Sequence, residues 1–308
     1  MKQLKLSAIL LSSILLTACG GGGGNNPSSN LNFPASATLA EANEENGEKV
    51  AKGTISKNVS YLNSVENSSG ANSSLIAHNV SNILSKYVEN LPQSNALNVV
   101  KYFDRACDVS GTISGSVNTD TAAYTITFNN CINNGDGAEA INGSAFGTVQ
   151  LDNNDKELSF SLKVRETLKV SNSTMDVGSS MDIKYSVAGD DNKDVTITMS
   201  ATGTENNQKY GCKVCKFHTK VLANNDIQIY QTEGQLYIGD DLGAYVIYDT
   251  SYDMSTTPFV FLHGDGKVNV GGIAKFKSKD NKIIEIKAVA NGNAELWIDG
   301  VFSKRITL

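Results

Sequence analysis

Apolar and polar residues alternate along most of this chain, and that alternation constrains the fold more than any other feature. Tyr124, Ile126 and Phe128 are each separated by one polar residue. Successive side chains of a β-strand point to opposite faces of a sheet, so a period of two predicts strands with one apolar face. The same period recurs at residues 158–164, 181–187, 195–199, 244–248 and 284–288.

Short turn sequences separate the alternating segments. They are Asn-Asn-Gly-Asp-Gly at 133–137, Asp-Asn-Asn-Asp at 152–155, Gly-Asp-Asp-Asn at 189–192 and His-Gly-Asp-Gly at 263–266. Asn, Asp and Gly tolerate the backbone angles of tight hairpin turns. The spacing predicts about ten to twelve strands. We therefore expect a mainly β (α+β) fold, with residues 101–308 forming a large antiparallel β-meander sheet or an open barrel.

Helical periodicity is confined to residues 36–100. Thr38-Leu-Ala-Glu41 has the form of a capping box, and apolar residues follow at helical spacing to residue 65. A second amphipathic pattern covers residues 76–91 and ends at Pro92. A sheet with one apolar face needs a covering layer, and one or two N-terminal amphipathic helices would supply it.

The first 18 residues have the form of a bacterial signal peptide. Lys2 and Lys5 precede an apolar run at residues 6–16 that is too short to span a bilayer as a permanent helix. Leu16-Thr-Ala-Cys19 resembles the lipobox, which implies a diacylglyceryl group on the Cys19 sulfur and an acylated amino group. Ordinary secretion with an unmodified cysteine is the alternative. Gly20 stands where Asp would favour inner-membrane retention, so we expect sorting to the outer membrane.

Residues 19–35 would then be a lipidated cysteine followed by a Gly/Asn/Ser tether. Five consecutive glycines follow Cys19. A coil of this composition reaches about 5–6 Å times the square root of its length. Whether the body faces the periplasm or the outside stays open. We expect the membrane to be a partner through Cys19, and any protein or small-ligand partner is unidentified.

Charge excludes one class of partner. The net charge is −6, and it becomes about −8 once the first 18 residues are removed. Nucleic-acid binding depends on neutralising phosphates with Lys and Arg, and the chain has no long basic run. We expect no nucleic-acid partner.

Four cysteines besides Cys19 fall into two pairs. Cys107 precedes one predicted strand and Cys131 ends the next, so a hairpin turning at residues 118–121 would place them side by side. Cys212 and Cys215 lie in Tyr-Gly-Cys-Lys-Val-Cys-Lys-Phe-His at 210–218. Disulfides form in the oxidising compartment that export implies. For Cys212 and Cys215 the alternatives are a local disulfide at a turn or bulge, a thiol-redox pair, and zinc binding with His218.

The remaining chemistry-bearing residues form no recognisable catalytic motif, and we expect no catalytic residue, no cofactor and no metal. His78, His218 and His263 lack partner motifs. Asp190-Asp-Asn-Lys-Asp194 imitates the start of a calcium loop but lacks its Gly and its final Glu, which favours a solvated turn. A further group, Tyr245, Tyr248 and Tyr252 among four aspartates, is either a candidate binding surface or ordinary sheet packing.

The cysteine and strand motifs together resemble a known group. A cysteine, a Gly/Ser-rich strand, Thr-Ile-Thr-Phe-Asn-Asn-Cys at 125–131 and an Asn-Gly-Ser hairpin resemble uncharacterised proteobacterial outer-membrane lipoproteins, over residues 106–299. The resemblance implies lipidation and a Cys107–Cys131 bridge but no activity. We expect a non-enzymatic envelope lipoprotein with a binding or structural role. The alternative is an envelope hydrolase or thiol-redox protein using His263 and Asp265, or Cys212 and Cys215.

Overall fold

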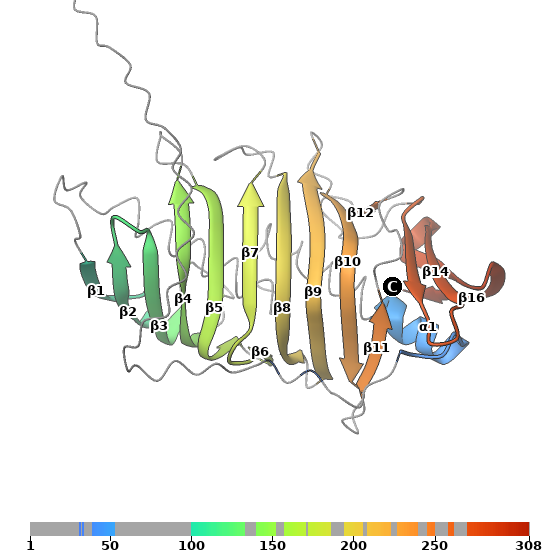
Figure 1. The fold of residues 1–308 in the computed structure, drawn as a ribbon, viewed down its shortest axis with the longest axis horizontal. Coiled ribbons are helices and arrows are strands. Elements are labelled where there is room, and N and C mark those ends of the chain that lie inside the picture. The colour runs from blue at the N-terminus through green and yellow to red at the C-terminus, as the bar shows by residue number, and fades with distance from the viewer. Residues whose placement is uncertain are drawn as a thin grey trace, which may run out of the picture.

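The computed structural model describes the chain in separate stretches. These are residues 31, 33, 39–52, 100–132, 140–151, 157–170, 172–185, 194–205, 208–222, 227–239, 245–249, 258–261 and 270–307. The predicted signal peptide, Cys19 with most of the predicted tether, and the second predicted helix lie outside them. Figure 1 shows the described strands side by side in one long row.

The described residues form sixteen strands, a short α-helix and one 3-10 turn. In chain order they are α1 (Glu44–Ala51), β1 (Val100–Ala106), β2 (Ser110–Asn118), β3 (Ala123–Ile132), β4 (Ile141–Leu151), β5 (Glu157–Val170), β6 (Ser173–Met175), β7 (Ser180–Tyr185), β8 (Val195–Glu205), β9 (Gln208–Val221), β10 (Ile227–Gly239), β11 (Tyr245–Asp249), β12 (Phe259–Phe261), β13 (Ile273–Lys277), β14 (Ile283–Val289), η2 (Ala290–Gly292), β15 (Asn293–Ile298) and β16 (Val301–Thr307). The mainly β prediction is confirmed.

All the described strands belong to one antiparallel sheet, and most of them pair with the next strand in the chain. The path runs from β1 to β16, with β7 and β12 beside it. The number of strands exceeds the ten to twelve predicted because some strands are very short. Strand β5 is long enough to pair with β7 along residues 159–163 and with β6 along 168–170. The predicted meander therefore branches at this point.

The alternation predicts the buried face of the sheet correctly. Tyr124, Ile126 and Phe128 are buried, and the residues between them are exposed. Two groups of buried side chains result: one spans β2 to β9, and the other joins α1 to strands β10 and β12–β16. Removing such apolar surface from water stabilises the fold by about 25 cal/mol per Å².

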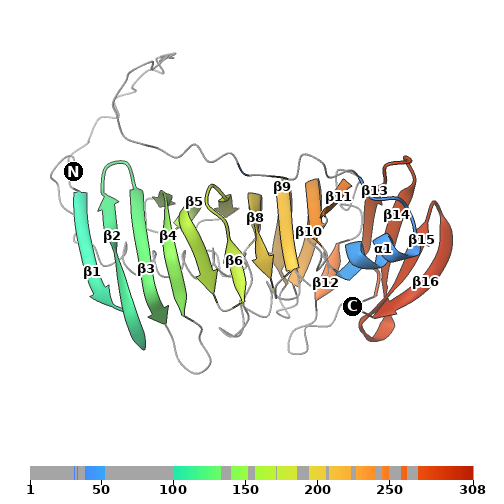
Figure 2. The same cartoon turned by 90° about the horizontal axis from the view of Figure 1, so that it is seen from below.

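Helix α1 packs on the buried side of β14, β15 and β16 at the C-terminal end of the sheet (Figure 2). Val50 and Ala51 are fully buried there. A Cβ atom added to Gly47 would lie 2.6 Å from a methyl carbon of Leu296, so the helix lies very close to β15. Salt bridges from Glu48 to Lys304 (2.5 Å) and to Lys52 (2.6 Å) flank the contact.

The predicted start of the first helix is wrong. The helix begins at Glu44, with Asn43 as its N-cap, rather than near Thr38. The Asn43 side chain accepts a hydrogen bond from the backbone N–H of Asn46 at 2.9 Å. Just upstream, the carbonyl of Ala40 accepts a hydrogen bond from the backbone N–H of Lys279 at 3.0 Å. That pairing holds residue 40 in a non-helical conformation beside the β13–β14 turn.

Candidate functional site: a disulfide-bridged bulge in strand β9

Strand β9 contains a disulfide between Cys212 and Cys215, three positions apart in the sequence. In a regular strand, residues three apart point to opposite faces of the sheet. Both cysteines are nevertheless buried, whereas the two residues between them, Lys213 and Val214, are both exposed. Val214 has a positive φ of 50°. One extra residue is thus accommodated as a β-bulge, which turns both sulfur atoms to the buried side.

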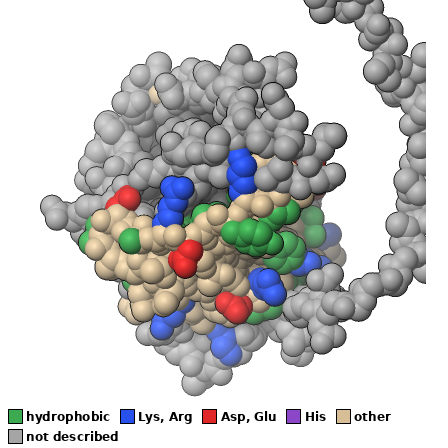
Figure 3. Space-filling view, turned by 90° about the vertical axis from the view of Figure 1, so that its left-hand side faces the viewer, with side chains coloured by type: hydrophobic (Ala, Val, Ile, Leu, Met, Phe, Trp, Pro, Cys, Tyr) green, Lys and Arg blue, Asp and Glu red, His purple; other side chains and the backbone are tan. Residues whose placement is uncertain are grey.

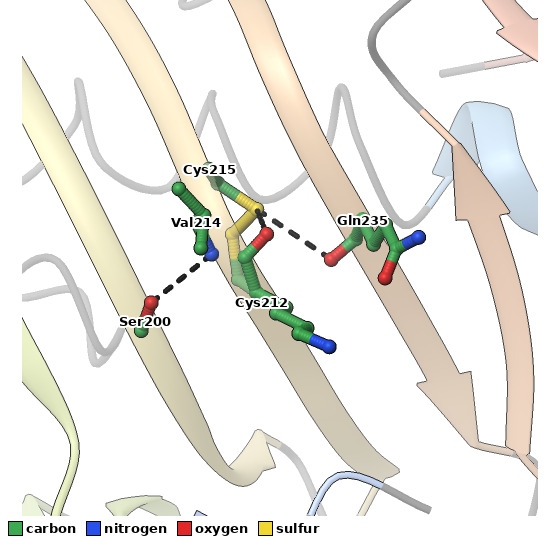
Figure 4. Close-up of a disulfide and its surroundings, with 6 residues drawn as sticks. Ser200, Cys212, Val214, Cys215 and Gln235 are labelled. Atoms are coloured by element: carbon green, nitrogen blue, oxygen red, sulfur yellow. Dashed lines mark hydrogen bonds between the residues drawn. A yellow bond between two sulfur atoms is a disulfide. The ribbon is translucent and has the colours of Figure 1, made fainter. Parts of the chain in front are cut away.

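The two neighbouring strands adapt to the bulge. The pairing of β9 with β8 shifts between Met199 and Ala201, and its pairing with β10 shifts between residues 231 and 235. Ser200 lies at the first shift, and its Oγ accepts a hydrogen bond from the backbone N–H of Val214 at 3.0 Å (Figure 4). That bond satisfies a backbone donor that the regular ladder would leave unpaired.

Gly234 makes room for the disulfide on the other side. Its φ is +127°, and a Cβ atom there would lie 2.5 Å from the Cα of Cys215. Only glycine fits that position because both the backbone angle and the space exclude a side chain. The Cys215 sulfur lies 3.6 Å from the carbonyl oxygen of Gln235 (Figure 4).

The prediction of a local disulfide at a bulge is therefore confirmed for Cys212 and Cys215. The pair lies within a strand, whereas a reactive thioredoxin-type cysteine has its pKa lowered at a helix N-terminus. His218 is drawn into a different contact, described below. Within the described residues, no group of three His, Cys, Asp or Glu side chains could hold a metal ion.

The second bridge joins Cys107 and Cys131, as the hairpin prediction requires. The β2–β3 hairpin pairs Val117 with Tyr124 across its turn. Gly111, with a φ of +76°, lies where an added Cβ atom would be 2.0 Å from the carbonyl oxygen of Asn130. This bridge also sits beside a register shift, so each disulfide of the chain fastens an irregular point of the sheet.

Sequence reasoning missed a pairing between His218 and Asp194. His218 lies on β9 and Asp194 directly precedes β8, where the β8–β9 register brings their side chains into a hydrogen bond. Lys220 lies 3.8 Å from the same carboxylate. A His–Asp pair orients an imidazole, but nucleophilic catalysis also requires a positioned nucleophile and oxyanion donors. The calcium-like sequence 190–194 contributes only Asp194 to the described residues.

The tyrosine group is only partly described. The backbones of Tyr245 and Tyr248 lie on β11, opposite residues 239 and 236 of β10. Their side chains, and all of Tyr252, lie outside the described residues, as do Cys19, His78, His263 and Asp265. The predictions on these residues remain predictions.

Exposed hydrophobic side chains mark the β1 end of the sheet. Figure 3 looks at this end and shows hydrophobic side chains among polar ones, with Lys and Arg beside them. On β1 itself, Val100 and Tyr102 are exposed. Single exposed apolar side chains are ordinary on protein surfaces.

A larger surface feature, also missed from the sequence, lies on the outward side of β13–β16. Lys287 Nζ lies 4.0 Å from the centre of the Trp297 ring, a cation–π contact. The indole N–H donates to Glu295 at 3.3 Å, and Phe302 packs edge-on against Trp297 with ring centres 5.7 Å apart. Glu295 in turn pairs with Arg305 at 3.2 Å.

A second set of contacts extends this surface across β13 and β14. Glu285 pairs with Lys287 at 2.7 Å and with Lys275 at 3.6 Å. The strand pairing places these residues in neighbouring rows, so the contacts run without interruption from β13 to β16. Lys277 lies two residues after Lys275, on the same partly exposed side of β13. We call this the Trp297 face: Lys275, Lys277, Lys287, Trp297, Phe302 and Arg305, with Glu285 and Glu295 between them.

Comparison of the chain with protein-family models, curated proteins and solved structures finds no match. The described helix is not long or apolar enough to cross a membrane. The structure therefore shows a large antiparallel β-sheet domain with two disulfide-bonded cysteine pairs.

Proposed function

We propose that the chain is a lipid-anchored envelope protein, held at the outer membrane through Cys19, whose β-sheet body has a non-enzymatic binding or structural role. The Leu-Thr-Ala-Cys sequence at 16–19 carries this proposal. It follows a short basic region and an apolar stretch of signal-peptide length. Two or more acyl chains hold a protein on a membrane stably, because each buried CH₂ contributes about 0.8 kcal/mol.

The two disulfides support export. Stable disulfides form in oxidising compartments such as the periplasm and the cell surface. Both bridges are buried in this sheet, where they brace bulges. Cys19 lies apart from these pairs in the sequence, which leaves its sulfur for lipid attachment.

A binding or structural role fits the described side chains better than catalysis does. The described residues bring together one hydrogen-bonded His–Asp pair and two closed disulfides. Acyl transfer or hydrolysis would require a nucleophile, a base and an oxyanion site that converge on one point. The hydrolase alternative rests on His263 and Asp265, which lie outside the described residues.

Metabolic labelling with palmitate tests the anchor. We expect label in the wild type and none in Cys19→Ala, while the double variant Cys212→Ala/Cys215→Ala keeps its label as the matched control. Intact mass of the membrane-extracted protein must show a chain that begins at Cys19 and carries acyl groups. An unlabelled wild-type protein, or one cleaved at another residue, refutes the proposal.

The location is tested on the same cells. Density-gradient separation of the two membranes should place the labelled protein in the outer-membrane fraction. Protease added to intact cells then distinguishes the two orientations, because release of the domain requires surface display. Recovery of the labelled protein in the inner-membrane fraction would contradict the outer-membrane sorting that Gly20 predicts.

A further inference from the structure

The Trp297 face presents its cations further out than its carboxylates. Side-chain exposure is 71% for Arg305 but 20% for its partner Glu295. It is 37% for Lys275 and 33% for Lys287, against 18% for the Glu285 that lies between them. The acidic groups are therefore recessed, and an approaching body meets the basic groups and the aromatic rings first.

This end of the chain also has the opposite charge from the rest. Residues 270–307 contain seven Lys and Arg against four Asp and Glu, a net charge of +3. The remainder of the chain contains 19 basic and 28 acidic residues, a net charge of −9. A positive surface on an acidic protein orients it toward a negatively charged partner.

Aromatic side chains accompany the cations. Trp297 lies among Lys287, Glu295 and Phe302, and Phe302 itself is exposed. Val301, also exposed, is at the tip of the same β15–β16 hairpin. Trp with its indole N–H prefers the boundary between lipid and water, where Lys and Arg reach the head groups.

The described part of the N-terminal segment packs on the C-terminal half of the sheet, on the buried side and therefore across the sheet from the Trp297 face. Phe33 packs against Tyr237 of β10, with ring centres 5.0 Å apart, and α1 packs on β14–β16. Eleven residues lie between Cys19 and Leu31, the first described residue. As a coil, such a segment reaches about 20 Å. An acyl group on Cys19 would therefore hold Leu31 and Phe33, and with them the β10 region of the sheet, close to the bilayer.

We propose that the Trp297 face docks on the anionic phospholipid surface of the membrane in which Cys19 is anchored. The bilayer attracts Lys275, Lys277, Lys287 and Arg305, and Trp297 and Phe302 enter the head-group layer. Docking gives the tethered body a fixed orientation relative to the lipid. This proposal rests on the proposed function for its anchor but not for the docking surface itself.

Trp297 reports on this contact directly because it is the only tryptophan of the chain. The full-length acylated protein is reconstituted into phosphatidylcholine vesicles with or without phosphatidylglycerol, and brominated lipids serve as quenchers. We expect a blue-shifted, strongly quenched Trp297 emission only when phosphatidylglycerol is present. Rising NaCl should reverse the quenching, since salt screens the attraction.

Charge removal measures the strength of docking. Each basic residue near an anionic surface contributes about 1 kcal/mol, so Lys277→Gln/Arg305→Gln should lower the ratio of docked to undocked protein about 30-fold. Lys169→Gln/Lys184→Gln is the matched control, because both lysines are exposed on β5 and β7 and the charge change is the same. The control should keep the wild-type ratio.

Three results would overturn the docking proposal: equal quenching with and without phosphatidylglycerol, quenching insensitive to salt, or an equal loss in both double variants. The salt arm uses the wild type and does not depend on any variant folding. Intact mass separates this proposal from the anchor. An acylated protein with unquenched Trp297 refutes docking alone. A protein without acyl groups refutes the anchor, and its addition to preformed vesicles then tests docking by the same emission.

Discussion

The two disulfides should stabilise the fold unequally, in proportion to the chain they close. Cys107 and Cys131 are 24 positions apart, and Cys212 and Cys215 are three apart. In the chain-entropy model, a closed loop of 25 residues restricts the unfolded state by about 3.5 kcal/mol, and a loop of four residues by about 1.9 kcal/mol. All four cysteines are buried, so replacing either pair by alanine removes the same buried atoms. The difference between the double variants should therefore be about 1.6 kcal/mol.

Urea unfolding followed by circular dichroism measures this difference. With a slope of about 2 kcal/mol per molar urea, the midpoint of Cys107→Ala/Cys131→Ala should lie about 0.8 M below that of Cys212→Ala/Cys215→Ala. Wild-type protein treated with reductant in urea is the control for complete opening of both bridges. A loss for the β9 pair that equals or exceeds the other would refute the reasoning. It would show that the bulge needs its bridge in the folded state.

Three further changes test the local geometry. Gly234→Ala should destabilise the fold by about 3 kcal/mol, because alanine there would have a strained φ and would also overlap the Cys215 backbone. Gly271 also has a positive φ but has open space around it, so Gly271→Ala should destabilise the fold by only about 1 kcal/mol. Thermal unfolding measures both changes. The pKa of Glu48 is lowered to about 2 by hydrogen bonds from two lysines. The stability that the ionised Glu48 carboxylate contributes is complete above pH 4.5 and is lost as the pH falls toward 2. Because a third of the side chain is exposed, Glu48→Gln should reduce this pH-dependent change in the free energy of unfolding by only about 1 kcal/mol, measured by unfolding at each pH. Asn43→Ala should cost about 1 kcal/mol of stability by removing the N-cap of α1, and an unchanged midpoint would contradict the cap.

The strands could be predicted from the sequence because burial of one face of the sheet makes apolar and polar residues alternate along each strand. Ile284, Ile286 and Ala288 are all fully or almost fully buried, and the residues between them are partly exposed. This alternation is a local property, since the polarity of each residue depends only on which side of its own strand it occupies. The start of α1 was not predictable in this way. The pairing of Ala40 with Lys279 decided it, across more than 200 residues of sequence.

The bulge in β9 could have been predicted from the spacing of its two cysteines. Two cysteines three apart in a strand cannot share a face, so a disulfide between Cys212 and Cys215 requires an inserted residue. The Trp297 face had no such signal. Glu295 and Trp297 meet Phe302 and Arg305 only through the β15–β16 register, which itself contains a shift between Leu296 and Trp297. Cross-strand contacts of this kind depend on a register that one strand does not specify alone.

Helix α1 makes the order of synthesis important for folding. Most strands pair with a neighbour close in sequence, so each hairpin can form soon after its residues emerge. The helix is different: its contacts from Glu44 to Ser303 and from Glu48 to Lys304 span 259 and 256 residues. Helix α1, the first described element, can therefore bury Val50 and Ala51 only after β15 and β16 have been synthesised. A chain that ends before β15 would keep that apolar stripe exposed to chaperones and proteases, so docking of α1 distinguishes a chain that contains β15 and β16 from one that lacks them.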